Sequence, residues 1–155
     1  MKKIIMALAL VASTMAQAAS VPVLPAADQQ MLLQSDNVKL ADNKKLVYNF
    51  TRIILSGRRL ERVREFMTEE YIQHNPNVET GLQGFIDFFS KLGGPRDIPS
   101  EVRGLVSIQA ESDLVTLSFV NQLTDPEGKK YTTTWFDMFR VQDGKISEHW
   151  DCDIK

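Results

Sequence analysis

Two ionisable residues stand out in this sequence because their surroundings could set them to transfer protons. His74 is one of only two histidines and lies in the stretch YIQHNP, between Tyr71 and the turn formed by Asn75 and Pro76. Asp137 lies in WFDMFRV, among aromatic and aliphatic residues. Imidazole and carboxylate groups are common general acids and bases in enzymes. What each residue does therefore depends on the group that the fold places it against.

The position of Asp137 follows from the hairpin that must contain it. Asp143 followed by Gly144 is a strong signal for a two-residue turn, which would pair Asp137 with Trp150 and Phe139 with Glu148. Strand alternation then places Asp137 on a face with mostly apolar neighbours. These are Tyr131, Thr133, Trp135, Phe139, Val141, Ile146, Glu148 and Trp150. An unpaired carboxylate in such surroundings costs several kcal/mol, so Asp137 needs a specific reason to be there.

Three interpretations of Asp137 are open on this pattern. A backbone or hydroxyl donor could satisfy the carboxylate, or an arginine from a loop could pair with it. It could instead line a cavity and act as a general base. For His74, the alternatives to a site role are a solvated loop histidine or one bonded to the backbone.

The helices that would position these residues lie in the first half of the chain. Apolar residues recur at intervals of three and four, which predicts helices over residues 42–56, 58–67 and 80–92. We expect Asp42 or Asn43 to cap the first helix, Gly57 to end it, and Thr80 to cap the third.

The second half of the chain changes to the period-two pattern of strands. The β-rich runs cover residues 101–110, 114–123, 131–141 and 145–154. Helices followed by an antiparallel sheet predict an α+β fold, with the helices packed on one face of a curved sheet.

The first residues predict export. Residues 1–18 contain two lysines, an apolar run from Ile4 to Val11, and small residues ending at Ala18, which is the pattern of a secretory signal peptide. The apolar run is shorter than the ~20 residues that a membrane-spanning helix needs. Cleavage after Ala18 would release a periplasmic or secreted protein. We expect residues 19–40, which begin with a proline-containing stretch, to form a flexible mature N-terminus.

Composition argues against several classes of partner and cofactor. Loss of the two leader lysines lowers the basic count from 18 to 16 against 20 acidic residues, a net charge of −4. That charge argues against binding nucleic acid or inserting into an anionic membrane. Cys152 is the sole cysteine, so no intrachain disulfide can form, and we expect the thiol to be buried. In the run HWDCD, a strand would point His149 and Asp151 to one side and Cys152 to the other. With so few thiol and imidazole groups, we expect no metal.

Three segments together resemble the SnoaL-like branch of the nuclear-transport-factor-2-like superfamily. They are YIQHNP, GLQGFIDFF and WFDMFRVQDGKISEHWD, and the resemblance runs from Lys44 to Asp151. It implies a SnoaL-like domain over residues 41–155 with a cone-shaped fold. In that fold three N-terminal helices pack in a strongly curved antiparallel sheet, with a pocket in the mouth of the cone. Proteins with this fold commonly form homodimers through the sheet.

The resemblance also implies a chemistry. Asp137 matches the position at which polyketide cyclases of the family carry their acid–base aspartate. It would move a proton at a carbon next to a carbonyl, as in aldol cyclisation, isomerisation or hydrolysis, without a cofactor. His74 would orient Asp137 or donate to the developing enolate oxygen. An apolar wall for a small hydrophobic carbonyl compound would come from Phe50, Tyr71, Trp135 and Trp150.

A second function remains open beside this one. Polyketide cyclases work next to cytosolic synthases, whereas the leader of this chain predicts export. The alternative is a non-catalytic periplasmic binding protein for a small hydrophobic ligand, in which His74 and Asp137 only hydrogen-bond that ligand.

Overall fold

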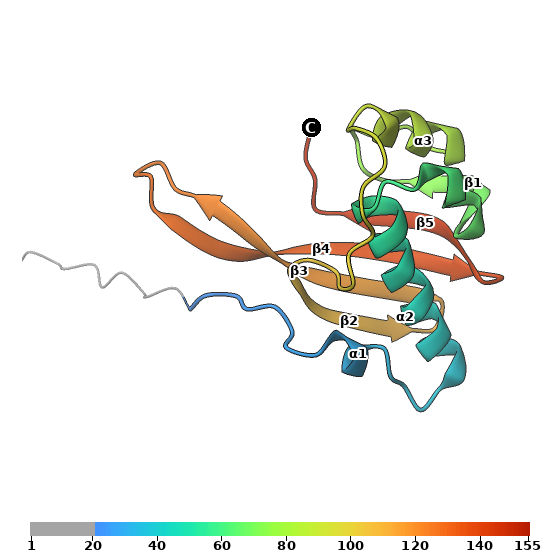
Figure 1. Cartoon of the computed structure of the whole chain (residues 1–155), viewed down its shortest axis with the longest axis horizontal. Helices are drawn as coiled ribbons and strands as arrows, with labels where there is room; N and C mark the ends of the chain where they lie inside the picture. Colours follow the sequence, from blue (N-terminus) through green and yellow to red (C-terminus); the bar gives the residue numbers. More distant parts are fainter. Residues whose placement is uncertain (1–20) are drawn as a thin grey trace, which may run out of the picture.

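The computed structural model describes residues 21–155, so the expected signal peptide lies outside the described part. Helical segments and strands follow one another as shown in Figure 1. The helical segments are α1 (Gln29–Leu32), α2 (Val38–Phe50), the π-helical η1 (Thr51–Ser56), the 3-10-helical η2 (Leu60–Glu65) and α3 (Leu82–Ser90). The strands are β1 (Met67–Gln73), β2 (Leu105–Glu111), β3 (Leu114–Thr124), β4 (Lys130–Gln142) and β5 (Lys145–Asp151). No helix in residues 21–155 has the length and apolar character needed to cross a membrane.

The strands form one curved sheet in the order β1-β5-β4-β3-β2. All neighbouring pairs are antiparallel except β1 and β5, which run parallel. The predicted α+β fold is confirmed, as are the four predicted strands, with β1 added at the edge. Sequence patterning missed β1 because its burial does not alternate: Met67 and Tyr71 are buried, whereas Glu69 and Glu70 between them are exposed.

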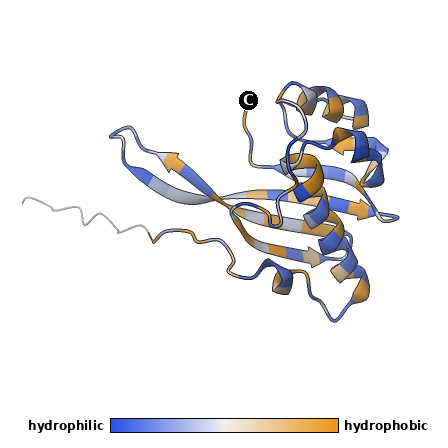
Figure 2. Ribbon diagram, in the orientation of Figure 1, coloured by the Kyte–Doolittle hydropathy of each residue, from blue (hydrophilic) through white to orange (hydrophobic). Residues whose placement is uncertain are grey.

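The longest helical segment, α2 continued by η1, supplies the apolar stripe that the sequence predicts. Val47, Phe50 and Ile54 are fully buried against the sheet, and Figure 2 shows hydrophobic positions along this segment and the strands it crosses. The helix begins earlier than expected, because the Asn37 side chain accepts a hydrogen bond from the backbone of Leu40 and caps it. It ends at Gly57 as predicted. A Cβ there would lie 2.7 Å from the carbonyl oxygen of Ile53, so the close approach requires glycine.

The second predicted helix is present but shorter than residues 58–67: it covers Leu60–Glu65, as the 3-10 helix η2. The expected cap of the third helix is wrong. Gly81, not Thr80, is the residue before α3, and the Thr80 hydroxyl instead donates to the backbone oxygen of Tyr71.

The segment before α2 is attached to the edge of the sheet. Gln29 is buried, its amide donates to the backbone oxygen of Val102, and its carbonyl oxygen accepts from the backbone of Val102 and from the Tyr48 hydroxyl. The expected domain boundary at residue 41 falls inside α2.

The β4–β5 hairpin contains the feature that decides the site. Gln142 pairs with Lys145 and Val141 with Ile146, as predicted. The register then shifts by one residue at a β-bulge, so that Phe139 pairs with His149 and Asp137 with Asp151. Ser147 is the extra residue. The predicted pairs of Phe139 with Glu148 and of Asp137 with Trp150 are therefore wrong. Beyond the bulge, β5 presents the opposite set of side chains to the interior, whereas Ile146 before it faces inward as predicted.

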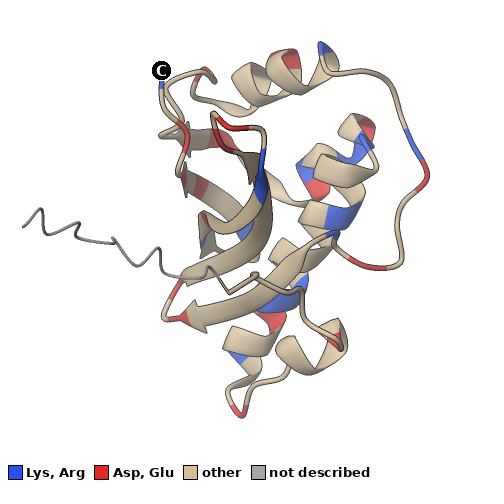
Figure 3. Ribbon diagram, turned by 90° about the vertical axis from the view of Figure 1, so that its left-hand side faces the viewer, with Lys and Arg blue, Asp and Glu red and all other residues tan. Residues whose placement is uncertain are grey.

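Surface properties agree in part with the sequence. Charged residues of both signs are dispersed over the chain and form no single basic patch in the view of Figure 3. Cys152, which we expected to be buried, is exposed just after the end of β5.

Candidate functional site

A cavity of about 140 Å³ lies between the inner face of the sheet, η1 and α3. Its lining combines aromatic rings with a few polar groups. The lining residues are Phe50, Leu55, Tyr71, Gln73, Asn75, Val78, Phe85, Phe88, Phe89, Asp137, Phe139, His149 and Asp151. A larger depression of about 900 Å³ lies along α1 and α2, but it is shallow and lined mainly by polar surface side chains such as Gln34, Asp36 and Lys45. The smaller cavity combines an aromatic lining with a largely buried cluster of ionisable groups, so we take it as the candidate site.

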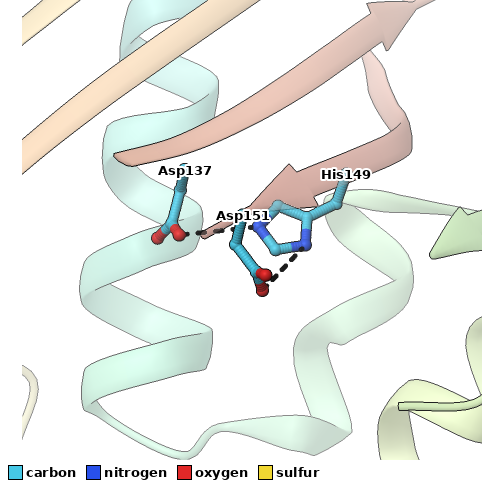
Figure 4. Close-up of side chains that lie close together, drawn as sticks. All are labelled: Asp137, His149 and Asp151. Carbon is cyan, nitrogen blue, oxygen red and sulfur yellow. Dashed lines mark ion pairs between the residues drawn. The ribbon is translucent and has the colours of Figure 1, made fainter. Parts of the chain in front are cut away.

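The polar end of the cavity is formed by Asp137 from β4 with His149 and Asp151 from β5 (Figure 4). His149 Nε2 lies 3.7 Å from Asp137 Oδ1, and His149 Nδ1 lies 4.0 Å from Asp151 Oδ2. The His149 side chain is 11% exposed and that of Asp151 only 8%. An imidazole thus sits between two carboxylates in a largely water-excluded site, which strengthens their electrostatic interaction.

Gln73, at the end of β1, fixes the orientation of the His149 ring. Its Oε1 accepts a hydrogen bond from the backbone N–H of Asn75 at 2.9 Å, so the carbonyl end of the amide must point this way. The same Oε1 lies 3.0 Å from His149 Nδ1, which must therefore carry a proton and donate it. In the neutral imidazole, Nε2 is then left with a lone pair, and it is this nitrogen that faces Asp137.

Each carboxylate has its own donor. Trp135 Nε1 donates to Asp137 Oδ1 at 2.7 Å, and Asn75 Nδ2 donates to Asp151 Oδ2 at 2.7 Å. The Asn75 amide is itself oriented, because its Oδ1 accepts from the backbone of Asn77 at 2.8 Å. These contacts hold both acids in place without a cationic partner for Asp137 or Asp151 among the residues that line the cavity.

The apolar wall is a set of packed rings. Phe139 stacks on His149 with ring centroids 4.6 Å apart, and Phe50 lies 5.7 Å from Phe139 and 5.9 Å from Phe85. Tyr71 packs edge-on against Phe85, and its hydroxyl accepts from Gln73 Nε2 at 2.9 Å. Burial, with further contributions from Asp151 and Asp137, raises the pKa of Tyr71 well above its ordinary value. Its phenol is therefore neutral near pH 7 and keeps a proton that it can donate.

The structure brings together some of the predicted site residues and separates others. Asp137, Phe50 and Tyr71 line the cavity, and Trp135 contacts Asp137. His74 and Trp150 do not line it. Instead, the two rings stack on each other with centroids 5.0 Å apart, and His74 Nε2 lies 2.8 Å from Glu148 Oε1. The expected convergence of His74 with Asp137 is thus not observed, because the bulge at Ser147 turns Glu148 and Trp150 away from the cavity.

Sequence reasoning missed His149, Asp151 and Gln73 as site residues. Alternation within HWDCD correctly places His149 and Asp151 on one side of the strand. Alternation could not tell which side of the strand faces the cavity, because that depends on the bulge at Ser147.

Asp137, His149 and Asp151 also have the composition of a cation site. Within the described part of the chain, they form a group whose nitrogen and oxygen ligand atoms all lie within 4.8 Å of one another. The His149 Nδ1–H bond to Gln73 leaves Nε2 free, an arrangement common among metal-binding histidines. The group therefore offers one nitrogen and two carboxylate ligands, and metal dependence needs a direct test.

Comparison with known proteins supports the fold. A family model described as a SnoaL-like domain matches residues 47–149. No curated protein matches the chain. A protein from Jannaschia sp. CCS1 described as a SnoaL-like polyketide cyclase is similar in structure, with a TM-score of 0.55 and 17% identity over 77% of this chain and 90% of that one. A protein from Acidithiobacillus ferrooxidans described as a polyketide cyclase has a TM-score of 0.54 and 17% identity over the same shares of the two chains. An LEH-like epoxide hydrolase from M. tuberculosis has a TM-score of 0.52 and 14% identity over 73% of this chain and 83% of that one.

Proposed function

This chain belongs to the SnoaL-like domain family, and from that premise we propose that it is an enzyme that moves a proton at a carbon next to a carbonyl. The acid–base pair is Asp137 with His149, and the chemistry needs no cofactor. The role that the family resemblance implied for His74 passes in this proposal to His149, because His149 is the histidine that faces Asp137.

The observation that carries this proposal is the orientation of His149. Its Nδ1–H is bound to Gln73, so the basic Nε2 points to Asp137 across 3.7 Å. That separation is too long for a direct hydrogen bond, so neither group uses the other as its partner, although Asp137 Oδ1 also accepts from Trp135 Nε1. A ligand within reach of both groups could therefore exchange a proton with either one. Two groups of different basicity in one enclosed site are a common arrangement for acid–base catalysis.

In the proposed step, Asp137 accepts the proton from the carbon next to the carbonyl. The C–H electrons move toward the carbonyl oxygen, which becomes an enolate, and the neutral phenol of Tyr71 donates a hydrogen bond to that oxygen. The protonated Asp137 carboxyl group exchanges its proton with solvent through His149 Nε2, which takes up one proton as it gives up another. Asp137 then returns a proton to the enolate carbon, which re-forms the C–H bond and the carbonyl and leaves Asp137 ionised and His149 neutral, as at the start. The aromatic wall keeps water away from the enolate.

The size of the cavity limits the substrate. A buried apolar cavity of about 150 Å³ is known to hold one benzene-sized ring, and this one is about 140 Å³. Sites for drug-sized ligands span ~300–1,000 Å³. The cavity therefore suits a one-ring carbonyl compound rather than a multi-ring polyketide.

Hydrogen–deuterium exchange tests the proposal directly. Acetophenone incubated with the protein in deuterium oxide should lose its methyl proton signal in proton NMR faster than in buffer alone. The Asp137→Asn variant should remove this acceleration, whereas Asp113→Asn, which changes an acid that contacts Arg140 outside the cavity, should keep it. A chelator should leave the rate unchanged. If acetophenone or related ketones bind with no acceleration of exchange, and if Asp137→Asn binds them equally well, the protein is a binding protein and not an enzyme.

Export and dimerisation are separate proposals that rest on other observations. The pattern of residues 1–18 supports cleavage after Ala18 and a periplasmic or secreted location, which cell fractionation and the intact mass of the purified protein test. The exposed Phe136 on β4, on the face opposite Asp137, supports a homodimer through the outer face of the sheet, which light scattering tests.

A further inference from the structure

A second polar feature lies beside the cavity, at the junction between η1 and η2. Arg58 follows Gly57 and has a left-handed backbone conformation, with φ of 54°. Its guanidinium group lies over the ring of Phe89, with Cζ 4.9 Å from the ring centroid. Phe89 also lines the cavity, together with Leu55 from η1. Arg58 is therefore separated from the cavity by the thickness of one lining residue.

The guanidinium group of Arg58 has no acidic partner. None of the ion pairs formed by the described residues includes Arg58 or Arg96. Two of the three Arg58 nitrogens, Nε and Nη1, are enclosed and have no hydrogen-bond acceptor. Burying a charged donor without an acceptor is costly, so these two nitrogens call for a partner such as an ordered water or an anionic group.

Arg96 adds a second cation at the same place. The loop after α3 returns to η1, where the backbone N–H of Arg96 donates to the Gly57 oxygen at 2.8 Å. Burial and the neighbouring Arg96 charge together lower the pKa of Arg58. The backbone hydrogen bond holds the two residues next to each other without a carboxylate to offset their repulsion.

The cavity itself has the opposite electrostatic character. Its lining contains Asp137 and Asp151 and no lysine or arginine. An anionic group could not be accommodated among these acids, whereas the two arginines beyond Phe89 would attract one. The molecule thus offers an acidic, aromatic interior and a cationic border on one side of it.

We propose that Arg58 and Arg96 bind the carboxylate or other anionic group of a substrate whose ring and carbonyl lie in the cavity. This assignment names the substrate class for the proposed function and rests on it: a one-ring carbonyl compound with an anionic group at the end remote from the carbonyl. In this arrangement, the anionic end of the substrate extends from the cavity past the Phe89 side chain to the two arginines.

Two ligands of the same shape test the assignment by binding alone. In para-acetylbenzoate, a carboxylate lies opposite the acetyl group, and para-methylacetophenone has a neutral methyl group in its place. We expect the wild-type protein to bind para-acetylbenzoate about tenfold more tightly, and Arg58→Gln or Arg96→Gln to remove that preference while binding of para-methylacetophenone stays the same. Arg64→Gln, which removes an equal charge from an exposed pair with Glu69, is the matched control and should keep the preference.

The outcomes separate this inference from the proposed function. If both arginine variants keep the wild-type preference, or if the wild type has none, the anion site is wrong whether or not exchange chemistry is observed. Arg96 lies on an exposed loop, so its variant reports on binding even if Arg58→Gln fails to fold. If the preference is present and depends on the arginines but Asp137→Asn does not affect exchange, the anion site stands and the catalytic proposal fails.

Discussion

The two histidines lie on either side of the same stretch of sheet and meet opposite conditions. His149, on the inner face, is buried, stacks on Phe139 and faces Asp137. His74, after the end of β1, has a side chain that is 43% exposed, stacks on Trp150 and pairs with Glu148. Both imidazoles therefore have one aromatic neighbour and at least one carboxylate, and residue type alone does not distinguish them.

The two histidines differ in the groups that hold their ring nitrogens. The Gln73 amide sets the protonated nitrogen of His149, whereas Glu148 is shared between His74 and Arg140, which also pairs with Asp113. The outer histidine belongs to a chain of surface ion pairs, which contribute little to stability. The inner one has a free basic nitrogen in an enclosed site. The face of the sheet on which a histidine lies, and not its local sequence motif, therefore decides which histidine we propose for the acid–base chemistry.

The largest expected effect is on catalysis. His149→Gln should lower the rate of deuterium exchange into acetophenone by about 10³-fold, because it removes one partner of the acid–base pair. His74→Gln should change that rate by no more than about twofold, since His74 lies outside the cavity. The comparison would be reversed, and the role of His74 restored, if His74→Gln caused the larger loss.

The second effect concerns stability on the two faces of β4. Phe139→Ala should lower the free energy of unfolding by about 3–4 kcal/mol, because the ring is 2% exposed and packs against Phe50 and His149. Phe136→Ala removes the same ring from the outer face, where it is 47% exposed, and should cost less than about 1 kcal/mol. Urea denaturation of both variants measures the difference. Equal losses would mean that the outer face is covered, as in a homodimer, and the loss for Phe136→Ala would then depend on protein concentration.

A third, smaller effect sharpens the role of Gln73. Gln73→Leu removes the acceptor for His149 Nδ1–H, and we expect about tenfold slower exchange, because the ring can then adopt the other tautomer. Gln73→Glu keeps an acceptor at this position and should restore most of the rate. Nitrogen NMR of the imidazole should show the Nδ1–H tautomer in the wild type and a mixture in Gln73→Leu. An unchanged tautomer in Gln73→Leu would contradict the positioning role.

The smallest effect concerns the outer network and depends on pH. Hydrogen bonds from Arg140 and then His74 lower the pKa of Glu148 below its ordinary value of 4.5. A carboxyl group whose pKa is lower in the folded state stabilises the fold above its unfolded pKa, and this stability is lost as the pH falls through the folded pKa. Glu148→Gln should therefore lower stability by ~0.5–1 kcal/mol at pH 7, with a smaller difference from wild type at about pH 3, below the unfolded pKa. Thermal unfolding at both pH values tests this, and a loss that is equally large in acid would point to packing instead.

Much of the fold could be predicted from the sequence, because its signals are local. The Asp143-Gly144 turn, the end of the helix at Gly57 and the apolar stripe of α2 each depend on a few neighbouring residues, and each is found in the structure. Strand β1 could not be predicted in this way. It pairs in parallel with β5, far along the chain, and two exposed glutamates interrupt its pattern.

The site was predictable on one strand and not on the other. Asp137 faces the interior as alternation on β4 indicates, because no irregularity intervenes between it and the turn on that strand. On β5, the bulge at Ser147 reverses the faces of every later residue, so Trp150 and Glu148 exchange places with His149 and Asp151. Nothing in the tripeptide around Ser147 signals a bulge. Its position is set by tertiary packing, which places Ile146 and His149 inside together.

The hydrogen bonds between the Asn75–Asn77 turn and the last residues of the chain have a practical consequence. Asn75 and Asn77 both donate to Asp153, Asn77 also donates to the Ile154 backbone, and Asn75 holds Asp151 at the floor of the cavity. An affinity tag fused directly after Lys155 would be separated from these contacts by that residue alone and could disturb the same asparagine that orients Asp151. Preparations for kinetic work are therefore better purified through the other terminus, or with a cleavable tag on a long spacer.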